Sequence, residues 1–411
     1  MSCGNILITE DGFGFVPRSR LRNVVFHEPR QIVRRYTLTN KHKAIVRLIS
    51  WGASIQSIKI PNRDGKLVDV VLGFDDMEGY LKDRYMGSII GRVANRISDG
   101  LMSLNNVIYP LSINDETGKD HFNGGVVAFD NVNWQSQIVN NRVVGSCFFY
   151  IIFFDEVMSH LSRDSREGYP GDLLTQVKYT WTDDNQLHIN IRATATKSTP
   201  VNVTSYCLFN LAGHGAGPKE LRKHVLTVNA DNWTFTDVQN KLPTGVISPV
   251  DCTVYELRLP TQLNRRRLFK VPGGGYNHNL CINSPNYWCY RFHARILHPA
   301  SGRFLEVYSN HPGLQVSTAN ELPDPERVNI CNLQADSFLT VNMKLKIRKS
   351  EAIYGKGGLP YYRHGGFALT PQNYPNAVNI EHFPSCVLHP GKVYIHDMTY
   401  KFGVLFEDEN F

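Results

Sequence analysis

The sequence has little that would place the protein in a membrane or in an oxidising compartment. No window of its 411 residues reaches the roughly 18 consecutive apolar residues that a membrane-spanning helix requires. The N-terminus lacks the basic segment and apolar core of a secretory signal. Eight cysteines are scattered without a CxxC pair or the spacing of a disulfide framework. We therefore expect no membrane association, reduced thiols and a cytoplasmic protein.

Strong charge of one sign is also missing. The net charge is +7, and 20% of the residues are charged against 42% hydrophobic, which is typical of a globular protein. The tight basic run Arg265–Arg267 is expected in a solvated turn, because it has no aromatic or glycine partners for a phosphate or nucleic-acid site. The histidines lack ligand-like spacing and pair with no cysteine. We expect neither a nucleic-acid partner nor a metal.

Long helical periodicity is nearly absent, and short alternating runs take its place. Residues 186–193, 225–228 and 303–308 alternate apolar and polar side chains, which predicts half-buried strands. Turn residues recur between such runs, for example at 62–65 and 299–302. Many strands with frequent turns over more than 300 residues predict an all-β protein, a large twisted antiparallel β-sandwich.

Four motifs fix a resemblance to a known family. They are Gly91–Ile97 (GRVANRI), Gly168–Asp172 (GYPGD), Phe209–Gly213 (FNLAG) and Pro375–Asn379 (PNAVN). Together they resemble the aldose 1-epimerase (galactose mutarotase) family from about residue 30 to about residue 405. The resemblance implies a galactose mutarotase-like supersandwich, a monosaccharide ligand such as galactose or glucose, and no cofactor.

Mutarotation opens a pyranose ring and recloses it on the other face of C1, so it needs a base for the C1 hydroxyl and an acid for the ring oxygen. The family uses a glutamate as base and a histidine as acid, and holds the sugar with further polar residues. Asn95 and Arg96 match the sugar-holding pair, and Gln315 matches a sugar-holding glutamine. The alternatives are a structural ion pair for Arg96 and a structural amide for Gln315.

The other site positions depart from the family pattern. Asn123 replaces a supporting histidine, and Asn277 replaces an aspartate that accepts sugar hydroxyls. Tyr206 stands at the position of the acid, where a phenol with an ordinary pKa near ~10 is poorly matched to neutral pH; the alternative is a packing aromatic. Thr370 stands at the position of the base and has no form that titrates near pH 7.

Three hypotheses follow for the function. The first is a pseudoenzyme that keeps the epimerase fold and binds carbohydrate without the family's acid and base. The second is an active epimerase with a non-standard acid and base; a sugar-phosphate epimerase meets the same objection, since that related branch also relies on the histidine and glutamate. The third is a protein-interaction module.

The domain organisation expected is an N-terminal extension over residues 1–30 and a single domain over 31–411. No shift in composition marks a second domain. The family has a much shorter connection at about 324–362, so this stretch is expected to be an insertion. A long loop of this kind is expected to be either functional or mobile. The interaction hypothesis builds the module around this stretch and the N-terminal extension, with a protein partner expected at 324–362.

Overall fold

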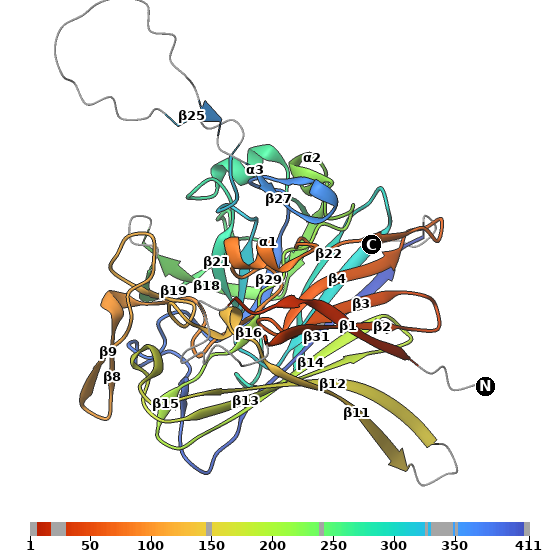
Figure 1. Ribbon diagram of the computed structural model, residues 1–411. Coiled ribbons are helices and arrows are strands. Elements are labelled where there is room, and N and C mark those ends of the chain that lie inside the picture. Colours follow the sequence, from red (N-terminus) through yellow and green to blue (C-terminus); the bar gives the residue numbers. More distant parts are fainter. Residues whose placement is uncertain are drawn as a thin grey trace, which may run out of the picture.

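The computed structural model describes residues 6–17, 30–144, 150–237, 242–324, 328–329, 348–349 and 352–406. Antiparallel strands dominate these residues (Figure 1). The predicted strands at 186–193, 225–228 and 303–308 are confirmed as β14 (Gln186–Ala195), β17 (Val225–Val228) and β23 (Arg303–Ser309). The predicted all-β sandwich is confirmed as well.

A nine-stranded antiparallel sheet forms the larger layer. In spatial order it contains β11 (Gln135–Val144), β12 (Tyr150–Ser162), β13 (Leu173–Trp181), β14, β31 (Tyr394–Val404), β23, β22 (Arg291–Leu297), β17 and β20 (Thr261–Gln262). Strand β31, late in the sequence, joins β14 on one side and β23 on the other. The sheet therefore has a strand from the far end of the chain at its centre.

Two five-stranded sheets complete the main framework. The first contains β1 (Leu7–Phe15), β2 (Ile32–Thr39), β3 (Ile45–Ile49), β4 (Ser54–Pro61) and β5 (Leu67–Asp69), in that order. Strand β1 lies within the expected N-terminal extension and pairs along its length with β2. The second contains β19 (Pro243–Pro249), β18 (Ala230–Thr236), β21 (Asn277–Ile282), β24 (Gly313–Ser317) and β29 (Ala368–Gln372).

Small elements connect the sheets. The two-stranded pairs are β6 (Ile89–Ile90) with β16 (Thr204–Ser205), β7 (Arg96–Ile97) with β10 (His121–Phe122), β8 (Leu101–Leu104) with β9 (Val107–Pro110), β15 (Thr199–Pro200) with β30 (Val387–Leu388), β25 (Val328–Asn329) with β26 (Arg348–Lys349), and β27 (Ile353–Tyr354) with β28 (Pro360–Tyr361). Short 3₁₀ turns occur at Ser98–Gly100, Phe129–Asn131, Arg166–Gly168 and Lys356–Gly358.

The described helices are short. They are α1 (Met77–Lys82), α2 (Gly217–Leu221) and α3 (Arg265–Lys270), and α2 and α3 lie near β27 at the upper end of Figure 1. The expectation of a turn at Arg265–Arg267 is wrong, since these residues begin α3. The reason is a side-chain cap: Asn264 Oδ1 accepts a hydrogen bond from the backbone N–H of Arg267 at 2.9 Å.

One continuous hydrophobic core joins the three large sheets. It includes Val177 and Ile189 of the nine-stranded sheet, Val46 of the first five-stranded sheet, and Leu314 and Leu369 of the second. Because alternate residues of a strand face opposite sides, the second five-stranded sheet turns these apolar side chains inward and polar ones the other way. That polar face carries the candidate site.

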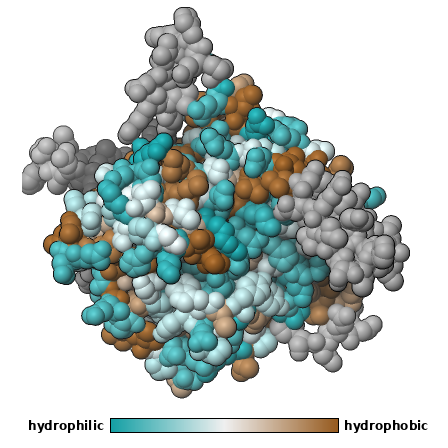
Figure 2. All heavy atoms as spheres, turned by 90° about the horizontal axis from the view of Figure 1, so that it is seen from below, coloured by the Kyte–Doolittle hydropathy of each residue, from teal (hydrophilic) through white to brown (hydrophobic). Residues whose placement is uncertain are grey.

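Most of the expected insertion at 324–362 lies outside the described residues. Its described end is anchored: Lys356 is buried, and its Nζ lies 2.7 Å from Asp69 Oδ2 and donates to the Gln56 carbonyl at 2.8 Å. In the described part of the chain, no helix is long and apolar enough to cross a membrane. On the face shown in Figure 2, hydrophobic residues form separate small groups among hydrophilic ones.

Candidate functional site

The candidate site is built on the polar face of the second five-stranded sheet. Asn279 of β21 lies opposite Gln315 of β24, and Gln315 lies opposite Thr370 of β29. Directly opposite residues share a face of an antiparallel sheet, and so do residues two positions apart on one strand. Asn277 on β21 and Gln372 on β29 therefore belong to this face too. Ser317 of β24, opposite Asn277, completes the set, so the backbone ladder aligns six polar side chains from three neighbouring strands.

Several polar atoms of this face have no hydrogen-bond partner among the described residues. They are Asn279 Oδ1, Gln315 Oε1, Thr370 Oγ1 and Gln372 Nε2. Burying a polar group without a partner typically costs about 1–3 kcal/mol, so such atoms are rare in a protein interior. A ligand with several hydroxyl groups would supply both donors and acceptors to this row.

Asn277 and Gln315 hold each other and reach a carboxylate. Gln315 Nε2 donates to Asn277 Oδ1 at 2.8 Å, and Asn277 Nδ2 donates to Glu321 Oε1 at 2.9 Å. Both side-chain amides are thereby fixed in orientation, because each uses a donor on the next residue. Asn277 and Glu321 are exposed at the rim, whereas Gln315 is half-buried.

Tyr206 is fixed beside the same face by packing. It lies directly after β16, is partly buried, and packs against a cluster that includes Leu208, Ala319 and Leu322. Burial raises the pKa of its phenol well above the ordinary value, and the nearby Glu321 carboxylate acts in the same direction, against a hydrogen bond with Ser317. The neutral phenol is thus favoured strongly at neutral pH.

Thr370 lies in the middle of β29 and is only 3% exposed. Its partner across the ladder is Gln315, so its side chain lies within the polar face. Thr370 precedes Pro371, a position that favours extended geometry, and it lies within the strand. A hydroxyl can donate or accept a hydrogen bond here, but it cannot take up a proton near pH 7.

Asn95 and Asn123 meet in a neighbouring turn. The backbone N–H of Asn95 donates to Asn123 Oδ1 at 2.8 Å, and the backbone N–H of Asn123 donates to the Asn95 carbonyl at 2.9 Å. The next residue, Arg96, accepts at its carbonyl from the backbone N–H of Asn376 at 3.1 Å, shortly after β29. This contact places the turn beside the end of the polar face.

Arg96 is paired with acidic residues. Its guanidinium lies 2.8 Å from Asp115 Oδ2, 3.7 Å from Asp120 Oδ2 and 3.7 Å from Glu116 Oε1, and it covers the ring of Phe122. Burial acts to raise the pKa of Asp115, but hydrogen bonds from Thr117 and from backbone N–H groups hold it well below the usual value. Arg96 therefore faces carboxylates that outnumber it.

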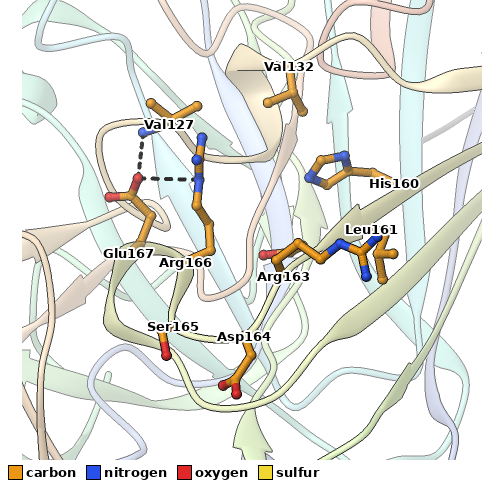
Figure 3. A pocket seen from close by; sticks show the side chains of 10 residues that line it. Val127, Val132, His160, Leu161, Arg163, Asp164, Ser165, Arg166 and Glu167 are labelled. Atoms are coloured by element: carbon orange, nitrogen blue, oxygen red, sulfur yellow. Dashed lines mark hydrogen bonds and ion pairs between the residues drawn. The ribbon is translucent and has the colours of Figure 1, made fainter. Parts of the chain in front are cut away.

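A separate cavity of about 510 Å³ is lined by residues that include Val127, His160 and Glu167, and by none of the predicted site residues. Figure 3 shows Glu167 at its wall, where the carboxylate accepts from Val127 N–H at 3.0 Å and lies 3.8 Å from Arg166 Nε. Ser162, also in the wall, accepts at Oγ from the buried Arg92 at 3.0 Å. Arg92, the first arginine of the Gly91–Ile97 motif, also donates to the carbonyls of Pro170 and Ser162 and therefore serves the scaffold.

The structure brings the predicted residues together in two groups. Gln315, Asn277 and Thr370 share the sheet face with Tyr206 beside it, while Asn95, Asn123 and Arg96 form the adjoining turn. Sequence reasoning missed Asn279, Gln372 and Glu321. Asn279 and Gln372 stand two residues after Asn277 and Thr370, so the period of a strand could have found them. No comparable signal marks Glu321.

Within the described residues, no group of three or more His, Cys, Asp or Glu side chains is arranged to hold a metal ion. The side-chain groups on the polar face that could contact a ligand are amides and hydroxyls, with one carboxylate at the rim. These groups suit hydrogen bonds to an uncharged polar ligand more than they suit coordination of a cation.

Residues 34–401 match the family model described as Aldose 1-epimerase. The chain is 38% identical over 360 residues to the galactose mutarotase of Bos taurus, covering 87% of this chain and 91% of that protein. It is 28% identical over 380 residues to the aldose 1-epimerase of Escherichia coli, covering 90% and 96% of the two chains.

Two solved structures share the fold. The galactose 1-epimerase of Lactobacillus acidophilus aligns with a TM-score of 0.72 at 20% identity, over 98% of this chain and all of that chain. A GalM/aldose epimerase homologue from C. elegans aligns with a TM-score of 0.71 at 24% identity, over 89% and 97%. The arrangement of the large sheets is therefore common to this chain and to these proteins.

Proposed function

The chain belongs to the aldose 1-epimerase family, and from this premise we propose that it binds an aldose without catalysing mutarotation by the family mechanism. The ligand is a monosaccharide such as galactose or glucose, held by Asn95, Arg96 and Gln315 together with Asn123 and Asn277. The protein is then a pseudoenzyme.

The row of polar atoms on the second five-stranded sheet supports the first part of this proposal, that the chain binds an aldose. Gln315 Oε1, Thr370 Oγ1 and Gln372 Nε2 lack partners among the described residues, although they are buried. A site of this kind rejects ligands that leave its polar atoms unpaired, and it favours a ligand whose hydroxyls satisfy them. An aldose presents such hydroxyls around its ring.

The residues at the acid and base positions support the second part of the proposal, that the chain does not catalyse mutarotation by the family mechanism. Burial of the partly exposed Tyr206 raises the pKa of its phenol further from neutrality, so it is a poor partner for reversible proton transfer. Thr370 supplies no carboxylate at the base position. General acid–base groups typically contribute about 10²–10⁴-fold each, so losing both leaves little acceleration over buffer.

The test is polarimetric or coupled mutarotation of α-D-galactose and α-D-glucose. We expect the natural chain to match the buffer blank, and the variant carrying Tyr206→His and Thr370→Glu to gain activity. An NMR titration with D-galactose measures binding in parallel. An active natural chain would refute the pseudoenzyme, and a natural chain that binds neither sugar would refute the first part of the proposal.

An active epimerase with a non-standard pair is the second candidate. One observation favours it: Tyr206 packs against the cluster that contains Leu322, the residue after Glu321, and the charge of Glu321 helps to raise the pKa of the phenol. Tyr206 and Glu321 are thus candidates for an acid and a base of unusual type. Tyr206→Phe distinguishes the two candidates only if activity is found. A measured rate that falls in this variant supports the pair, whereas an unchanged rate excludes Tyr206 as the acid.

A cytoplasmic location belongs to the same proposal. Cys207, Cys252, Cys281, Cys289 and Cys386 are unpaired among the described residues. Thiols of this kind persist in a reducing compartment. Fractionation of cells that express the chain tests the location.

A further inference from the structure

Glu321 is a carboxylate that no motif predicts, and it is joined to the centre of the polar face. The connection runs from Gln315 Nε2 to Asn277 Oδ1 at 2.8 Å and from Asn277 Nδ2 to Glu321 Oε1 at 2.9 Å. The Asn277 amide has one orientation in which it both accepts from Gln315 and donates to Glu321. The carboxylate is therefore positioned by the sheet even though it lies in the loop after β24.

The Glu321 carboxylate is exposed to solvent and also acts electrostatically on Tyr206, beside the polar face. Glu321 is exposed, and its charge is one of the causes that raise the pKa of the partly buried Tyr206. Because Asn277 links it to Gln315 through two hydrogen bonds, this exposed carboxylate lies at the rim of the polar face.

Among the charged groups named at the site, carboxylates outnumber cations. Arg96 is the cation among the predicted site residues, and its guanidinium is already surrounded by Asp115, Asp120 and Glu116. Glu321 adds a further negative charge at the other end of the site. A phosphate monoester carries about −1.5 to −2 charges near pH 7, so it meets repulsion here.

A carboxylate is an acceptor with two oxygens, and hydroxyl groups are its natural donors. Hydrogen bonds to an ionised acceptor are about twice as strong as neutral ones. With Asn277 donating to one oxygen, lone pairs remain on both oxygens for hydroxyls of a ring sugar. Glu321 thereby supplies the charged acceptor that the amide of Asn277 cannot.

Resting on the sugar-binding function proposed above, we propose that Glu321 contacts the ligand as its charged hydrogen-bond acceptor and makes the site select uncharged aldoses over phosphorylated ones. This assigns a specificity-determining role to a residue outside every motif that identifies the family. It also explains why the modest net positive charge of the chain does not imply an anionic ligand.

The experiment is a calorimetric or NMR titration of the full chain with D-galactose and with D-galactose 6-phosphate. It compares the natural chain, Glu321→Gln and the control Glu10→Gln. Gln can still accept from Asn277, so the first variant removes charge while the hydrogen-bonded chain is kept. Glu10 is an exposed carboxylate on β1, in the other five-stranded sheet.

We expect Glu321→Gln to bind D-galactose about 10-fold more weakly and to bind the phosphorylated sugar as well as, or better than, the natural chain does. The control should match the natural chain for both sugars. Equal weakening of both sugars would reveal a structural role only, and unchanged affinities would remove Glu321 from the site; either result overturns the inference. Failure of the natural chain to bind either sugar instead overturns the sugar-binding function itself, and this inference with it.

Discussion

Asn95 and Asn123 fix each other's backbones through a reciprocal pair of hydrogen bonds. One runs from Asn95 N–H to Asn123 Oδ1 at 2.8 Å, and the other from Asn123 N–H to the Asn95 carbonyl at 2.9 Å. Both residues have positive φ, 68° and 49°, a region that asparagine tolerates better than most residues. At a position where the family resemblance implies a supporting histidine, this chain has a residue that shapes the turn before Arg96.

Asn123→Ala should therefore lower the free energy of unfolding by about 1–2 kcal/mol and weaken aldose binding. The change removes the acceptor for Asn95 N–H and places a less tolerant residue at positive φ. Urea unfolding and a D-galactose titration measure the two effects. Asn106→Ala is the matched control, because Asn106 has a φ of 62° in the exposed turn between β8 and β9. Asn106→Ala should lower the free energy of unfolding without changing aldose binding. Weaker binding in both variants would contradict the role assigned to Asn123.

Thr370→Val should raise the free energy of unfolding by about 1 kcal/mol and weaken aldose binding several-fold. The replacement keeps the shape and removes a buried hydroxyl that has no partner among the described residues. Thr175→Val is the control. The hydroxyl of Thr175 on β13 is also buried without a partner among the described residues, but it lies in the nine-stranded sheet. It should gain stability without any change in binding. Unchanged binding in Thr370→Val would show that the ligand does not use this hydroxyl.

Lys356→Met should destabilise the protein by about 3–5 kcal/mol, because it leaves the Asp69 carboxylate without its buried partner. The double change of Lys356→Met with Asp69→Asn should recover part of this loss. Chemical denaturation measures the free energy of unfolding of the natural chain, the single variant and the double variant. As a control, Lys197→Met breaks the exposed pair with Asp164 and should leave the unfolding midpoint almost unchanged. Equal effects of the two lysine substitutions would contradict the argument.

Glu156→Gln should make stability less dependent on pH. Burial, with the charge of Glu10 assisting, raises the pKa of Glu156 to about 8, and among the described residues neither carboxylate oxygen has a hydrogen-bond partner. An acid with a raised pKa in the folded state binds more protons folded than unfolded. Its contribution is therefore complete below the unfolded pKa and is lost as the pH rises through about 8.

The natural chain should accordingly lose about 3–5 kcal/mol from this group between pH 4.5 and pH 8.5, while the Gln variant should not. Tryptophan fluorescence during urea unfolding at several pH values measures this, since the chain has five tryptophans. Glu78→Gln, at an exposed position in α1, controls for the loss of a carboxylate. Parallel pH profiles for the natural chain and Glu156→Gln would contradict the prediction.

Local sequence pattern predicts the strands well and the site only in part. The alternation at 186–193 reports which side chains face the core, and β14 follows it residue by residue. The site depends instead on register: Asn279, Gln315 and Thr370 are distant in sequence, and only the pairing of β21, β24 and β29 aligns them. Glu321 depends in addition on the path of a loop, for which no periodicity exists.

The order of strands in the nine-stranded sheet has a consequence for how a cell makes this protein. Strand β31 comes after the other strands of that sheet along the chain but pairs with β14 on one side and β23 on the other. During translation both neighbours keep an open edge of unpaired backbone groups until residues 394–404 have left the ribosome. Such edges invite pairing with other nascent chains. A chain truncated before Tyr394 should thus collect in inclusion bodies, since it lacks the strand that joins the two halves of the sheet.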